Sequence, residues 1–140
     1  MDSDWRNRNR SLRMKGLKTL KQHQINKAYG ALKRLEKMQL PVKAAYSIFM
    51  LIKQLTPAYE FELDRERKLL ESYHGTMNQD GSIAFETSED ASRFGAEIEE
   101  LNSLDVDVKI KPVQINFDDL DQQTLTPYDI SCLEGFVSFA

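Results

Sequence analysis

The residues whose side chains could most clearly bind a ligand lie near the N-terminus, where arginines alternate with asparagine and serine beside a single tryptophan. Arginine side chains can engage phosphate groups and an aromatic ring can stack on a base, so this pattern favours contact with DNA or RNA. A solvated tail, or a tail packed on the acidic half of a neighbouring chain, has the same composition. The candidate nucleic-acid-binding residues are Trp5, Arg6, Arg8, Arg10 and Arg13.

The remaining reactive residue types do not form a recognisable catalytic or metal site. His23 and His74 fall on different predicted helices, without cysteines or acidic residues at the spacing of zinc ligands. Residues 76–87 partly match a calcium-binding loop, but Thr76 and Thr87 stand where that loop needs its first and last carboxylates, so a plain turn is favoured. The single cysteine, Cys132, excludes an internal disulfide and fits a small core residue. We therefore expect no cofactor, no metal and no enzymatic activity.

Two long helices should form the first half of the chain. Apolar residues at steps of three and four predict a helix from about Thr19 to Gln39, which Pro41 ends. The next pattern runs from Val42 to Tyr73 and would span about 48 Å as one helix. Pro57 leaves two alternatives open, a continuous kinked helix or a new helix that starts at Thr56.

The second helix carries apolar residues at alternating steps of four and three, which is the period of a coiled coil. A single shorter partner helix cannot cover its whole length, and exposed apolar side chains are unfavourable in a monomer. The pattern therefore predicts a homo-oligomer, most simply a homodimer, through this helix. The candidate oligomer-interface residues are Ala45, Phe49, Ile52, Tyr59, Leu63 and Leu70.

Shorter elements follow in the second half of the chain. A turn at residues 78–81 should precede a strand at 82–86, and Thr87 is placed to cap a helix that ends near Leu104. Alternation predicts strands at 105–111 and 113–117, separated by Pro112. The strand, helix and strand from 82 to 111 could form a right-handed parallel crossover.

The C-terminus should hold a short apolar helix capped by Thr126 and extending through Phe136 and Val137. Two interpretations remain open for its apolar residues. They could close the core against the strand at 105–111, or they could form an apolar peg for a partner. Thr126, Pro127 and Asp129 define a helix start that a loose tail would not need, so we favour the interpretation in which these residues close the core.

These elements predict a mostly helical α+β fold, with a long helical hairpin packed on a small two- or three-stranded sheet and additional short helices. Residues 1–18 should be a basic, flexible arm, and 19–140 a single domain made of the helical hairpin (19–74) and an acidic α+β part (75–140). Formal charge supports this division, since residues 1–43 carry a net +9 and residues 75–140 a net −11. A chain with its charges separated in this way must either fold its basic part onto its acidic part or present both to partners.

Several short phrases of the sequence are similar to known proteins: Leu40-Pro-Val-Lys-Ala-Ala-Tyr, then Tyr73-His74-Gly75, and the ending Leu125-Thr-Pro-Tyr-Asp-Ile. Together they resemble small hypothetical proteins of tailed bacteriophages and prophages. The resemblance covers roughly residues 19–139 and contains no diagnostic catalytic motif. It implies a phage or prophage origin and a non-enzymatic role, as an assembly factor, a minor virion component or a host-interaction protein.

The functional prediction is therefore a protein that acts by binding itself and another protein. A nucleic-acid-binding protein that uses the arginine arm, an inhibitor of a host defence protein, and an enzyme with an unfamiliar site are the alternatives. No membrane span is expected, because the longest apolar stretch, from Ala44 to Ile52, is shorter than the roughly 20 residues that a bilayer requires. The expected location is the host cytoplasm or the virion.

Overall fold

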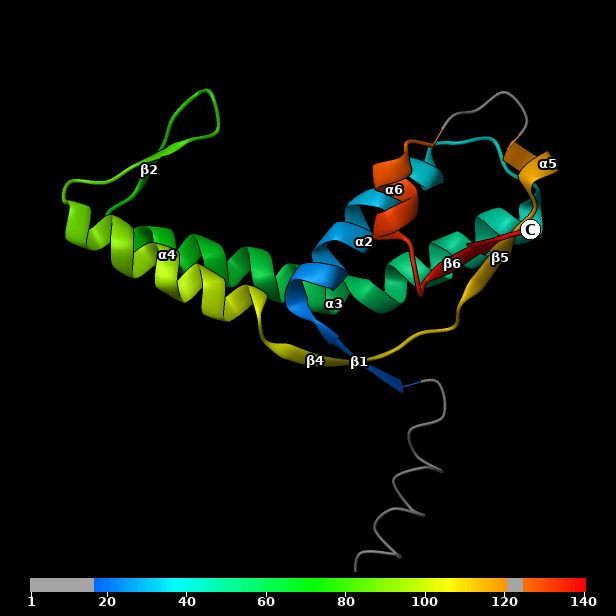
Figure 1. The fold of residues 1–140 in the computed structure, drawn as a ribbon, viewed down its shortest axis with the longest axis horizontal. Helices are drawn as coiled ribbons and strands as arrows, with labels where there is room; N and C mark the ends of the chain where they lie inside the picture. Colours follow the sequence, from blue (N-terminus) through cyan, green and yellow to red (C-terminus); the bar gives the residue numbers. More distant parts are fainter. Residues whose placement is uncertain (1–16, 121–124) are drawn as a thin grey trace, which may run out of the picture.

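The structure, a computed structural model, describes residues 17–120 and 125–140. Its centre is a long helical hairpin of two antiparallel helices, joined by the turn that contains Pro41 (Figure 1). The elements are β1 (Leu17–Lys21), α2 (Gln22–Glu36), α3 (Val42–Ser72), β2 (Thr76–Met77), β3 (Ile83–Ala84), α4 (Ser88–Asn102), β4 (Asp105–Lys109), β5 (Val113–Ile115), α5 (Phe117–Leu120), α6 (Pro127–Cys132) and β6 (Val137–Phe139). The predicted mostly helical α+β fold is confirmed, although three separate two-stranded sheets replace the single small sheet.

The core lies between α2 and the N-terminal half of α3. One face of each helix is apolar at steps of three and four, and these faces meet. Burying each such leucine or isoleucine contributes about 1.5–3 kcal/mol, which is the main stabilisation of the hairpin. The fully or almost fully buried residues here are Ile25, Leu32, Leu35, Ile48, Leu51 and Leu55.

The chain before α2 differs from the prediction, because Thr19–Lys21 belong to a strand rather than to a helix. β1 pairs antiparallel with β4, with Leu17 opposite Lys109 and Leu20 opposite Val106. This pairing joins segments more than 80 residues apart, and Lys21 adds an ion pair to Asp105 at 2.6 Å. Contacts so distant in sequence override the local helical pattern, which becomes continuous only from Gln22.

Helix α3 is continuous through Pro57, so the predicted alternative of a new helix at Thr56 is wrong. Pro57 lacks the N–H that would bond to the Lys53 carbonyl, but both residues are exposed and water can satisfy that oxygen. The Thr56 hydroxyl donates back to the Ile52 carbonyl at 2.8 Å, as a threonine inside a helix does.

The predicted parallel crossover between residues 82 and 111 is also wrong. β3 instead forms a hairpin with β2, with Met77 opposite Ile83, and β4 pairs with β1. Gly81 turns the hairpin at a φ of +89°, a conformation that glycine adopts without strain. The predicted start of α4 is confirmed, since the Asp90 N–H donates to the Thr87 hydroxyl at 3.1 Å.

At the C-terminus, the predicted helix extension through Val137 is wrong. α6 has the predicted cap, with the Asp129 N–H donating to the Thr126 hydroxyl at 3.1 Å, but it ends at Cys132. Gly135, at a φ of +87°, then turns the chain into β6, which runs parallel to β5. Phe136 and Val137 close the core as the favoured interpretation expects, beside β5 rather than β4.

The molecule is elongated because one part of it projects beyond this core (Figure 1). The projection consists of the C-terminal half of α3, the β2–β3 hairpin and α4, and is called the α3–α4 extension below. Helix α2 and strand β5 pack on α3, while α6 packs on α2 and β6 pairs with β5 (Figure 1). The extension therefore has far fewer neighbours than the rest of α3.

Candidate interaction groove between α3 and α4

The α3–α4 extension holds together through a thin apolar layer. Leu69 of α3 and Phe94 and Leu101 of α4 are buried there. Near the tip, the rings of Phe85 and Phe94 lie 5.1 Å apart, and Gly75 fits tightly against Leu70 because a side chain there would collide with it. Two helices with one such layer leave part of their apolar surface uncovered by the residues that the structure describes.

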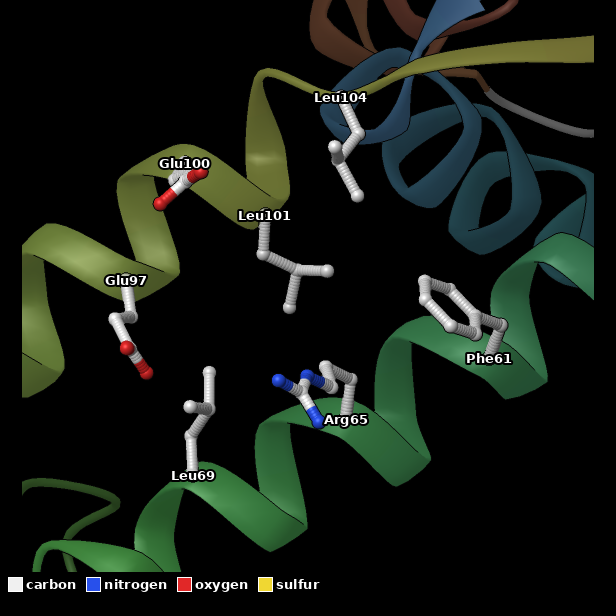
Figure 2. Close-up of a pocket in the computed structure, with 7 residues that line it drawn as sticks. All are labelled: Phe61, Arg65, Leu69, Glu97, Glu100, Leu101 and Leu104. Carbon is white, nitrogen blue, oxygen red and sulfur yellow. The ribbon is translucent and has the colours of Figure 1, made fainter.

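That uncovered surface includes a groove at the base of the extension, with a cavity of about 190 Å³. Figure 2 shows it between the facing sides of the two helices. Leu69 and Leu101, each 5% exposed, form its floor, whereas Phe61 (53% exposed) and Leu104 (40% exposed) stand at its edge. The complete lining is Phe61, Arg65, Leu69, Glu97, Glu100, Leu101 and Leu104.

The groove also carries charges of both signs. Arg65 lies on the α3 side, and Glu97 and Glu100 lie on the α4 side (Figure 2). Burial and the adjacent Glu97 carboxylate, which is hydrogen-bonded to the phenol, raise the pKa of Tyr73, so Glu97 already has a partner. Within residues 17–120 and 125–140, neither Arg65 nor Glu100 takes part in an ion pair. Both charges are therefore available to an external partner.

Gln22 fixes the base of the groove. This residue is fully buried, and its backbone N–H donates to the Leu104 carbonyl at 2.9 Å. Its side-chain amide donates to the Ala58 carbonyl at 3.0 Å and to Asn26 at 2.9 Å. The first residue of α2 thus links α3 to the end of α4 and sets the separation of the groove walls at this point.

The carboxyl group of Glu62 is buried on α3, one turn after Ala58. Glu62 is 6% exposed, and burial together with the charge and hydrogen bond of Glu66 raises its pKa from 4.5 to about 7. The local stability of α3 at the start of the extension should therefore depend on pH near neutrality. The apolar pattern of the sequence did not predict a buried carboxyl group, because an inward-facing position of a helix is expected to hold an apolar residue.

The predicted interface residues of α3 differ in burial. Ile52 belongs to the core, and the ring of Tyr59 stacks on Tyr29 with centroids 3.9 Å apart. Phe49 and Leu63 are about half exposed. An undistorted α-helix departs from a heptad repeat by only about 20° per heptad, so these residues stay on one side of α3 and differ in burial because different elements cover different parts of the helix. Ala45 is exposed and Leu70 partly buried at opposite ends of α3.

The groove residues could have been found from a different pattern. Phe61, Arg65 and Leu69 follow one another at steps of four, which places them on one side of a helix. Glu97 and Leu101 have the same spacing on α4. The coiled-coil period selects a different set of α3 residues. Which α3 residues face α4 depends on where α4 docks, and the sequence of α3 alone does not encode this.

The structure says less about the other predictions made from the sequence. The candidate nucleic-acid-binding residues Trp5, Arg6, Arg8, Arg10 and Arg13 lie outside the described residues. Inside the described ranges, no three histidine, cysteine, aspartate or glutamate side chains are grouped so that they could hold a metal ion. Across the same residues, no helix has the length and apolar character to cross a bilayer.

Comparison with family models, with curated proteins and with solved structures gave no match to this chain. The resemblance to phage and prophage proteins therefore stays a prediction. Any functional inference depends on the groove and the surfaces described here.

Proposed function

We propose that this chain is a non-enzymatic protein that acts through protein–protein interaction, with the α3–α4 groove as its contact surface. The observation that carries the proposal is the half-exposed pair Phe61 and Leu104 above the buried floor of Leu69 and Leu101. An aromatic ring that is half exposed beside a preformed cavity is the type of residue that dominates binding energy in protein interfaces.

The occupant that we propose is a second copy of the same chain. In a two-fold symmetric dimer the same surface serves both subunits, so it must be complementary to itself. The groove meets this condition, because an apolar centre separates the cation Arg65 on the α3 side from the carboxylates Glu97 and Glu100 on the α4 side, and within the described residues none of the three takes part in an ion pair. A two-fold axis through the centre would place Arg65 of each copy opposite Glu100 of the other.

This proposal keeps the predicted homodimer through α3 but moves its contact from the heptad residues to the groove. Exposed apolar side chains along an extended two-helix structure favour a four-helix arrangement, in which each copy covers the other. The sequence resemblance to phage proteins would give such a dimer a role in assembly or in contact with a host protein.

Multi-angle light scattering at micromolar concentration tests the proposal. We expect a mass of twice 16.2 kDa for the unmodified chain. Phe61→Glu places a charge in the apolar centre and should raise the dimer dissociation constant by roughly 30-fold or more, as expected for an interface hot spot.

Phe49→Glu is the matched control, since Phe49 is on the same helix, is also 53% exposed, and lies outside the groove. It should leave the mass unchanged. A monomeric unmodified chain, or dissociation by Phe49→Glu and not by Phe61→Glu, would contradict the groove as the contact surface.

A further inference from the structure

A second cleft lies between the middle of α3 and strand β4, which runs beside that helix (Figure 1). Its cavity measures about 550 Å³ and shares no lining residue with the α3–α4 groove. The lining consists of Lys53, Gln54, Pro57 and Ala58 from α3 and residues 106–109 from β4. This site is called the α3–β4 cleft below.

One wall of the cleft is an open strand edge. Among the residues that the structure describes, β4 pairs only with β1. Successive side chains of a strand point to opposite faces, yet four successive residues of β4 line the cleft, so the cleft follows the edge of the strand rather than one face. In an antiparallel pair only every second residue bonds to the partner strand, and the others direct their N–H and carbonyl groups away from it. The five residues of β4 therefore offer roughly 17 Å of edge to a further strand.

The helical wall of the cleft holds a backbone carbonyl that has lost its helical donor. Pro57 has no N–H, so the Lys53 carbonyl one turn earlier lacks the hydrogen bond that it would make inside a regular helix. Both residues line the cleft, so an N–H of a bound segment can replace solvent at this oxygen. Just beyond β4, the Lys111 N–H donates to the Gln54 side chain at 3.3 Å. A side chain of α3 thus already satisfies one backbone group at the end of the cleft.

The charges of the cleft favour an acidic occupant. Lys53 and Lys109 are exposed and take part in no ion pair with any described residue. Asp107 also lines the cleft, but its carboxylate accepts a hydrogen bond from the Thr19 hydroxyl of β1 at 2.5 Å. Lys109 and the partly buried Val106 point to opposite faces of β4. A strand that lies beside β4 therefore meets a cation on one face and an apolar surface on the other.

We propose that the α3–β4 cleft binds an extended segment of another protein in which acidic and apolar side chains alternate. The segment adds to β4 as a further strand, which is a recurrent mode of peptide recognition. Its backbone bonds to the open edge and to the Lys53 carbonyl, its carboxylates meet Lys53 and Lys109, and its apolar side chains pack beside Val106. This inference does not depend on the α3–α4 groove, and the two can fail independently.

Fluorescence anisotropy with the full chain and a labelled peptide of alternating valine and glutamate tests the inference. The peptide should bind at low salt, whereas the same peptide with a central proline should bind much more weakly, because proline cannot donate to a strand edge. Pro57→Ala returns an N–H to the Lys53 carbonyl, and it should weaken binding about 3- to 10-fold, as expected for the loss of one hydrogen bond. Lys53→Gln combined with Lys109→Gln should weaken binding about 3- to 30-fold at low salt, because two exposed ion pairs are lost.

Lys37→Gln combined with Lys43→Gln is the matched control, since it removes the same charge from exposed positions outside the cleft. It should leave the affinity close to that of the unmodified chain. Thermal melting followed by circular dichroism verifies that each variant is folded. Amide hydrogen exchange locates the peptide, because bound peptide should slow the exchange of N–H groups in β4.

Equal binding of the two peptides, equal losses in the two double variants, or an unchanged affinity in Pro57→Ala would each overturn the inference. The absence of binding at low salt would do the same. A lower mass in light scattering for Lys53→Gln combined with Lys109→Gln would assign the edge of β4 to a second copy of the chain, and this result would also overturn the inference.

Discussion

Replacing Glu62 with glutamine should stabilise the protein above neutral pH and leave it nearly unchanged in mild acid. Glu62 is 6% exposed, and burial and the neighbouring Glu66 raise its pKa from 4.5 to about 7. Between these two pH values the folded state binds a proton that the unfolded state has released. Folding stability must therefore fall as the pH rises from about 4.5 to about 7, because the unfolded chain ionises more easily.

The size of the effect follows from the same values. A pKa raised from 4.5 to about 7 corresponds to at most about 3 kcal/mol. Glu66 is only partly buried, so water screens its share of the repulsion, and the expected gain is about 1–3 kcal/mol. Glutamine has the shape of the protonated acid and cannot ionise, so Glu62→Gln removes this cost above pH 7.

Urea denaturation followed by circular dichroism, at about pH 5 and about pH 8, measures the difference. The unmodified chain should lose stability between the two pH values, whereas Glu62→Gln should lose less. Glu60→Gln serves as the control, since Glu60 is on the same helix and is exposed. If Glu62→Gln shifts the unfolding free energy equally at both pH values, or destabilises the protein at pH 8, the reasoning about a buried carboxyl group is refuted.

Three further substitutions test individual contacts by chemical denaturation. Phe136→Ala should cost about 3–5 kcal/mol, because the ring is 3% exposed in the core; a cost below about 1 kcal/mol would remove Phe136 from the core. Arg34→Gln should cost about 1–3 kcal/mol at neutral pH, because Arg34 Nε donates to the buried Asp129 carboxylate at 2.7 Å; the difference should shrink in strong acid, since Arg34 holds the pKa of Asp129 below its usual range. Thr87→Ala should cost about 1 kcal/mol through loss of the α4 cap, and an unchanged midpoint would show that the cap contributes nothing.

Features encoded by neighbouring residues were predictable from the sequence. Thr87 and Thr126 cap α4 and α6 as expected, because a threonine hydroxyl satisfies an N–H only three residues away. Pro41 ends the first helix and leads into α3, since proline fixes its own backbone and restricts the residue before it. The helical hairpin follows from these signals and from the apolar faces of α2 and α3.

Features that depend on distant pairing were not predictable. β1 is a strand because β4 lies beside it, and the sequence of residues 17–21 does not indicate that its partner strand begins at Asp105. The turn at Gly135 ends α6 early and lets Val137 join β5, although the apolar spacing there fits a helix equally well. The groove has the same origin, because Phe61 and Leu104 become neighbours only when α4 docks on α3.

The central claim is that two copies of this chain meet through the α3–α4 groove, and a charge exchange between Arg65 and Glu100 tests it most directly. Arg65→Glu and Glu100→Arg should each produce a monomer, because each places like charges opposite one another across the two-fold axis. Mixing the two variants should restore a particle of twice 16.2 kDa in light scattering, since both contacts then join opposite charges. If either variant alone remains a dimer, or if the mixture stays monomeric while the unmodified chain is a dimer, the groove is not the interface.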